Sequence, residues 1–177
     1  LAWQGCSARG FLWTPDDGMQ TLENLANGNN RASAIAADGE VIAGFAQGNF
    51  NRTPAAWLAS TGLAHPTYPF DPDVQGELGA VSSDGSILAG QYYSETATPN
   101  TFYFQACYWT ESDGVVILPE VTGYNGGMVL GVSDDTRTFV GMSGTILTGR
   151  TATMWRQEWG AMDLKQKLID LAREAAH

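Results

Sequence analysis

The chain has 177 residues, of which 44% are hydrophobic and only 16% are charged, and its formal net charge is −10. This length suits one domain with a sizeable core. Only nine Lys and Arg are spread over the acidic chain, which excludes the basic surface that a nucleic-acid or anionic-membrane partner needs. No run reaches the length of a transmembrane segment. The 21 Gly and six Trp residues favour a turn-rich all-β protein.

A tryptophan followed five residues later by glycine recurs along the chain, with 44, 52 and 46 residues between successive tryptophans. Each occurrence predicts a short strand that ends at the Trp, a tight turn, and a second strand after the Gly. The four pairs are Trp13 and Gly18, Trp57 and Gly62, Trp109 and Gly114, and Trp155 and Gly160.

A second marker follows each of the first three tryptophan pairs and consists of an Asp with a closing glycine six residues later. Asp38-Gly39 and Asp84-Gly85 predict two-residue hairpins in which both turn residues have positive φ. Asp135-Thr136 departs from this pattern and predicts another type of turn. The closing glycines, which we expect to let strands approach closely, are Gly44, Gly90 and Gly141.

Four-stranded units of this length are typical of β-propellers. We therefore predict an all-β, propeller-like array of four-stranded antiparallel blades within residues 1–164. The full repeats are predicted at about 9–52, 53–104 and 105–150, with a partial repeat at 151–164. A single blade cannot bury both of its faces, so the tryptophans and aliphatic residues should fill the space between stacked blades.

Three and a half repeats are too few for an ordinary closed ring. Residues 1–5 read like the end of a fourth strand, and we expect them to complete the partial blade at 151–164. A longer ring and a homodimer in which two copies complete each other are the alternatives. Residues 165–177 carry leucines at helical spacing and predict a short amphipathic helix, which either covers an end of the β-domain or binds a partner.

The repeats resemble the HAF repeats of bacterial extracellular and surface-exposed proteins and of autotransporter passenger regions. Phe11-Leu12-Trp13 and Val81-Ser82-Ser83-Asp84-Gly85 carry this resemblance, although no repeat contains a literal His-Ala-Phe. The resemblance covers about residues 9–165. It implies a propeller-like fold and an extracellular, cell-surface or periplasmic bacterial protein, and it supplies no catalytic site.

The second repeat is the longest and has two loops rich in aromatic residues, which on a repeat scaffold often carry binding. These rings are suited to stacking on a sugar or gripping a peptide. The alternative is that they cover the flank of the domain. The candidate ligand-binding residues are Tyr68, Phe70, Tyr92, Tyr93, Phe102 and Tyr103.

The carboxylates fall mainly in turns, where backbone conformation explains them, so we assign no catalytic residues and no cofactor. Asp71 and Asp73 are weak calcium candidates with Glu77 nearby, but a calcium loop needs more oxygen ligands than these. Cys6 and Cys107 either form one disulfide or, as we expect, remain inert thiols.

The function predicted from these features is an exported, non-enzymatic binding or adhesion module for carbohydrate or protein on a surface. A hydrolase of extracellular polymers is the first alternative and requires paired acids such as Asp71, Asp73 or Glu95 in one cleft. A purely structural passenger or spacer is the second.

Overall fold

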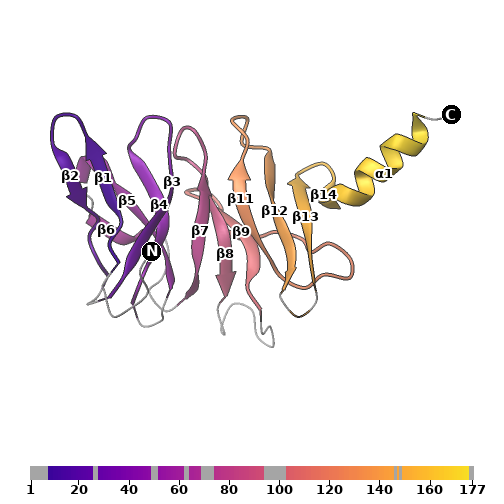
Figure 1. The fold of residues 1–177 in the computed structure, drawn as a ribbon, viewed down its shortest axis with the longest axis horizontal. Coiled ribbons are helices and arrows are strands. Elements are labelled where there is room, and N and C mark those ends of the chain that lie inside the picture. The colour runs from indigo at the N-terminus through magenta and orange to yellow at the C-terminus, as the bar shows by residue number, and fades with distance from the viewer. Residues whose placement is uncertain are drawn as a thin grey trace.

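A computed structural model describes residues 8–25, 28–48, 52–61, 64–68 (backbone alone), 74–93, 103–145, 147 and 149–175. It forms a row of antiparallel sheets with a helix at one end (Figure 1). The strands are β1 (Phe11–Thr14), β2 (Gly18–Thr21), β3 (Asn30–Ile35), β4 (Val41–Ala46), β5 (Thr53–Leu58), β6 (Ala64–Tyr68), β7 (Gln75–Val81), β8 (Leu88–Tyr93), β9 (Gln105–Thr110), β10 (Gly114–Ile117), β11 (Gly127–Val132), β12 (Thr138–Thr145), β13 (Gly149–Arg156) and β14 (Gly160–Asp163); the helices are η1 (Ala59–Thr61) and α1 (Leu164–Glu174).

The strands form three four-stranded sheets and one two-stranded sheet, each with its strands in sequence order. We call β1–β2 the half-sheet, and β3–β6, β7–β10 and β11–β14 the first, second and third sheets. Figure 1 shows them side by side, with the half-sheet at one end and α1 at the other. The all-β, propeller-like array with a short C-terminal helix is confirmed.

The sheets are offset from the predicted repeats by half a unit. Each four-stranded sheet joins an Asp hairpin to the tryptophan hairpin that follows it, as in the antiparallel pairing of β4 with β5. The predicted repeats 9–52, 53–104 and 105–150 therefore do not coincide with the blades. Within each repeat, the chain passes to the next sheet after the tryptophan hairpin. The partial repeat 151–164 is part of a full sheet, because β13 pairs with β12 over eight residue pairs. The predicted contribution of residues 1–5 to this blade stays a prediction, since these residues lie outside the described residues.

The Asp hairpins share one turn that differs from the predicted one. The Gly39 amide donates to the Ala36 carbonyl (3.0 Å), and the Thr136 amide makes the same bond to Ser133 (2.9 Å). Gly39 has φ of 79° and Thr136 of 59°, whereas Asp38 has no positive φ. The loop is thus longer than two residues and has one left-handed position, and the third turn is of the same type as the others.

Thr136→Gly should stabilise the protein by about 1 kcal/mol, because a non-glycine residue with left-handed backbone costs roughly 1–2 kcal/mol. Chemical denaturation measures the gain. The reverse change, Gly39→Thr, places its Cβ in open space at an equivalent turn and should lose a similar amount. Equal stability of all three proteins would contradict this account of the turn.

A serine and an aspartate close the second of these turns. Asp84 Oδ1 accepts hydrogen bonds from Ser82 Oγ (2.6 Å), Ser86 Oγ (2.7 Å) and the Ser86 amide (3.0 Å). Ser82 Oγ in turn accepts from the Ile87 amide (2.9 Å). These hydrogen bonds, led by that of Ser82, lower the pKa of Asp84 from 3.8 to about 2.

The pH dependence of stability should report this turn. The folded-state pKa of Asp84 lies below its ordinary value, so the hydrogen bonds to its carboxylate stabilise the fold above pH 3.8. Their contribution is lost as the pH falls from 3.8 toward about 2. The stability difference between the wild type and Asp84→Asn should therefore shrink across this window in urea titrations. A difference that stays constant down to pH 2 would rule out the role given to Asp84.

A β-bulge explains why each closing residue is glycine. The pairing of the first two strands slips by one residue in every four-stranded sheet, between Leu78 and Ala80 in the second sheet. The slip presses a carbonyl against the partner strand, so that a Cβ on Gly90 would collide with the Glu77 carbonyl oxygen. Gly44 and Gly141 meet Arg31 and Met128 in the same way.

The core lies between the sheets, and the tryptophan of each third strand faces the sheet before it. Trp57 and Trp155 are almost fully buried, and their indole N–H groups donate to Glu23 O (2.9 Å) and Pro119 O (2.8 Å). The Cys107 side chain is a buried free thiol, and burial raises its pKa to about 12. It is therefore an inert core residue; Cys6 lies outside the described residues.

An ion-pair cluster joins the first and second sheets. Glu77, 5% exposed on β7, accepts from Arg31 (3.0 Å) and Arg52 (2.8 Å) through the same carboxylate oxygen. Both guanidinium groups also lie over the Phe45 ring, 5.1 Å from its centre. Between the Asp turns of the same two sheets, the Ala37 amide donates to Ser83 O (2.9 Å).

The helix α1 begins at its N-cap Asp163, whose carboxylate accepts from the Gln166 amide (3.1 Å). It lies beside β13 and β14 and projects from the end of the row (Figure 1). None of its residues is buried, so it does not cover the end of the domain with its apolar stripe, and Leu168 and Leu171 remain exposed. No helix in the described part of the chain is long and apolar enough to span a membrane.

Candidate functional site

The loop predicted to carry binding joins β8 to β9. Phe102 lies outside the described residues, as do Phe70, Asp71 and Asp73 of the other loop, and Tyr68 is described by its backbone alone. Three of the predicted aromatic residues are therefore placed by the structure: Tyr92, Tyr93 and Tyr103.

Tyr92 and Tyr93 point to opposite faces of β8, because side chains alternate along a strand. Tyr92 is only 8% exposed and packs in the core between the first and second sheets. This corrects its assignment as a ligand contact, since a ring buried between sheets cannot meet a ligand. Tyr93 is half-buried and meets the Phe104 ring edge to face, with 6.1 Å between ring centres.

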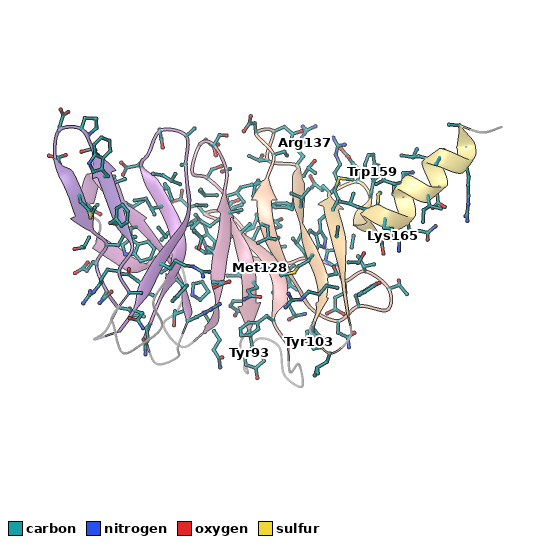
Figure 2. The ribbon with its side chains drawn as sticks, in the orientation of Figure 1. Tyr93, Tyr103, Met128, Arg137, Trp159 and Lys165 are labelled. Carbon is teal, nitrogen blue, oxygen red and sulfur yellow. The ribbon has the colours of Figure 1, made fainter. Side chains whose placement is uncertain are left out.

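Tyr103 lies at a cavity of about 480 Å³ beside the second and third sheets. Figure 2 shows Tyr93 and Tyr103 at the edge of the molecule where β8 ends, with Met128 further inside. The size is within the range of small-molecule pockets. The lining residues are Gln91, Tyr103, Phe104, Asn125, Gly127, Met128, Met142, Gly144, Thr145, Leu147 and Arg150.

Glu120, in the β10–β11 connection, holds Tyr103 in place. Its carboxylate hydrogen-bonds to the Tyr103 phenol and accepts from the Gly126 amide (3.0 Å). Burial is the main cause that raises the pKa of Tyr103, and the negative charge and the hydrogen bond of Glu120 raise it further. The phenol is therefore protonated at neutral pH and keeps one lone-pair side for a ligand.

Glycines allow the segments that line the cavity to approach one another closely. The Gly127 amide donates to Phe104 O (3.0 Å), and a side chain on Gly126 would collide with the same carbonyl. The Gly144 amide donates to Gly126 O (2.9 Å) at a φ of 100° that favours glycine. These contacts fix the segment that carries Asn125 against the end of the β12–β13 hairpin.

The lining combines an apolar floor with a few polar groups. Phe104, Met128 and Met142 supply apolar surface, and Arg150 is the one charged residue among the lining residues. Sequence reasoning found Tyr103 and missed Asn125 and the methionines. The Gly126-Gly127 pair, which is no part of the repeated motif, is the signal that would have pointed to this wall.

A second cavity of about 360 Å³ lies at the end of the sheets that carries the Asp turns. Two arginines line it, Arg137 and Arg156, and Arg156 pairs with Glu158 (3.3 Å) and lies over the Trp159 ring at 4.9 Å. The Tyr103 cavity is the larger of the two and contains one of the predicted aromatic residues, so it is the better candidate site.

The calcium candidates Asp71 and Asp73 stay a prediction, because both lie outside the described residues. Among the described residues, no group of three His, Cys, Asp or Glu side chains gathers. Glu77, which stands near Asp71 and Asp73 in the sequence, is held instead by Arg31 and Arg52. Its carboxylate therefore serves the contact between two sheets.

Comparison with known proteins places the fold. No family model matches the chain, and no curated protein is similar to it. Among solved structures, TolB from Acinetobacter baumannii is similar with a TM-score of 0.51 and 17% identity, over 85% of this chain and 35% of that one. A candidate TolB from Agrobacterium tumefaciens matches with a TM-score of 0.58 and 11% identity, over 81% and 51%. The chain thus spans about a third and about half of their lengths, and the likeness is one of fold.

Proposed function

We propose that the protein is an exported, non-enzymatic binding module that holds a carbohydrate in the Tyr103 cavity. The observation that carries this proposal is the lining itself. An aromatic ring and methionine side chains stand beside neutral amide and hydroxyl groups, with one arginine.

This mixture suits a sugar better than a purely apolar ligand. A sugar ring has an apolar face that packs on an aromatic ring, while its hydroxyls need donors and acceptors around the edge. Gln91, Asn125 and Thr145 offer such groups, and Arg150 adds a donor for a carboxylate or sulfate on the sugar. A peptide on a protein surface is the alternative ligand.

The Tyr103 ring should contribute much of the affinity. Tyr103→Ala should weaken glycan binding about tenfold or more, because it removes both the stacking surface and the hydrogen-bonded phenol. Tyr103→Phe keeps the ring and should retain most of the affinity. Trp159→Ala removes an exposed aromatic ring (55% exposed) near α1, away from Tyr103 in Figure 2, and should change nothing. The measurement is titration calorimetry with the best ligand from a glycan array.

A glycosidase panel run beside the array separates binding from hydrolysis. Binding without release of reducing ends supports the proposal. Turnover would favour the hydrolase alternative with acids such as Asp71, Asp73 or Glu95, and binding to a peptide array alone would move the ligand class to protein. A protein that binds neither glycan nor peptide would favour a structural spacer.

The proposed location is extracellular, on the cell surface or periplasmic. It is supported by the resemblance of the repeats to HAF repeats, which remains a prediction. Fractionation of the native cells tests it, and recovery in the cytoplasm alone would contradict it.

A further inference from the structure

The two ends of the row of sheets expose apolar side chains, several of them at positions that are buried or partly buried inside the row. On the half-sheet, Phe11 is 53% exposed, Trp13 61% and Met19 67%. Trp13 and Met19 are antiparallel partners, and Phe11 lies two residues before Trp13, so all three share one face. In the first, second and third sheets, the equivalent face packs against the sheet that precedes it in the row.

The inner counterparts of Trp13 show what this face contacts when it is covered. Trp155 packs in one cluster with Ala80 and Ala89 of the second sheet. Trp109 packs against the cluster that contains Ala43 of the first sheet. In both cases the tryptophan of one sheet lies in or against the cluster that contains the residue just before the closing glycine of the preceding sheet.

At the other end of the row, the residue in that position is Val140, just before Gly141. Its equivalents Ala43 and Ala89 are fully buried, but Val140 is 43% exposed. Its antiparallel partner Met154 lies on the same face. The helix α1 lies beside β13 and β14 and leaves this surface open.

We propose that copies of this chain associate head to tail, with the Trp13 face of one copy packed on the Val140 face of the next. The occupant of each end face is thus a second copy. The contact would continue, between molecules, the packing that already joins the first sheet to the second and the second to the third. Because the two faces differ, the contact is heterologous, and it either closes a ring or extends a chain of copies.

Complementary variants test this directly. Trp13→Glu and Val140→Glu each destroy one face by placing a charge in an apolar contact. In light scattering after gel filtration, the wild type should increase in mass with concentration, whereas each variant alone should remain a monomer. An equimolar mixture of the two variants should give a species of twice the monomer mass, because one intact face of each kind remains.

Ile35→Glu, which changes a side chain 50% exposed on β3 of the first sheet, inside the row, should associate as the wild type does. Circular dichroism checks folding. Met19→Glu replaces Trp13→Glu if that variant fails to fold, and Ala152→Glu, two residues before Met154 on the same face of β13, replaces Val140→Glu. A wild type that remains monomeric at every concentration would overturn the proposal. So would a variant mixture that stays monomeric while the wild type associates, since the contact would then join like faces or other surfaces.

Discussion

Replacing Gly90 with alanine should cost about 4 kcal/mol or more, which is much of the stability of a typical domain. The bulge in β7 presses the Glu77 carbonyl into the place where the new Cβ would lie. Backbone on both sides is held by ladder hydrogen bonds, so neither strand can move away cheaply. Thermal unfolding and urea titration measure the loss, and an outcome in which the variant does not fold is consistent with it.

A glycine at the bulge of the third sheet provides the matched control. Gly131 stands at the position that Ala34 and Ala80 hold in the other repeats, and a Cβ there would meet only a methyl group of Val140. Gly131→Ala should therefore change the free energy of unfolding by less than about 0.5 kcal/mol. Similar losses at Gly90 and Gly131 would show that the closing glycine has no special role.

Removing both cations from the buried carboxylate of Glu77 should be the next largest effect. Arg31→Met and Arg52→Met together leave that charge without its partners, although they keep apolar cover over Phe45. The free energy of unfolding should fall by about 3 kcal/mol. This is the lower end of the range for a broken buried ion pair, because the two arginines are half exposed. The change in unfolding free energy at neutral pH measures it.

Adding Glu77→Gln to that double variant separates the charge from the packing. Glutamine has the same shape without the charge, so more than half of the lost stability should return. If the triple variant is as unstable as the double variant, the arginines act through packing and the ion pair contributes little.

The repeat predicted most of the architecture because its signals are local. Each Trp-to-Gly segment and each Asp turn forms a hairpin from residues close together in the chain. The pairing between hairpins could not be predicted from the sequence. Each Asp hairpin has a tryptophan hairpin before it and another after it, and the local pattern does not say which of the two it pairs with. The ladders of β4 with β5, β8 with β9 and β12 with β13 show that it pairs with the following one.

Burial within the repeat also depends on the neighbours. Trp13 and Trp155 have the same local motif, yet Trp13 is 61% exposed and Trp155 is 1% exposed. The difference is that, among the described residues, a sheet precedes the tryptophan in one case only. Likewise, the strand pattern could say that Tyr92 and Tyr93 face opposite ways, but it could not say which of them faces the core.

The candidate site was only partly predictable. The loop length and aromatic content pointed to Tyr103, whereas Met128, Met142 and Arg150 come from strands whose ends meet there through tertiary packing. The glycines that allow this approach, Gly126 and Gly144, have positive φ values that only the structure reveals.

Methionine-methyl NMR is the most direct test of binding in the Tyr103 cavity. The chain has five methionines, of which Met128 and Met142 line the cavity and Met19, Met154 and Met162 do not. Adding the glycan that scores highest on the array should shift the methyl signals of Met128 and Met142 and leave that of Met19 unchanged. Shifts confined to the other three methionines, or none at saturating glycan, would contradict binding at this site.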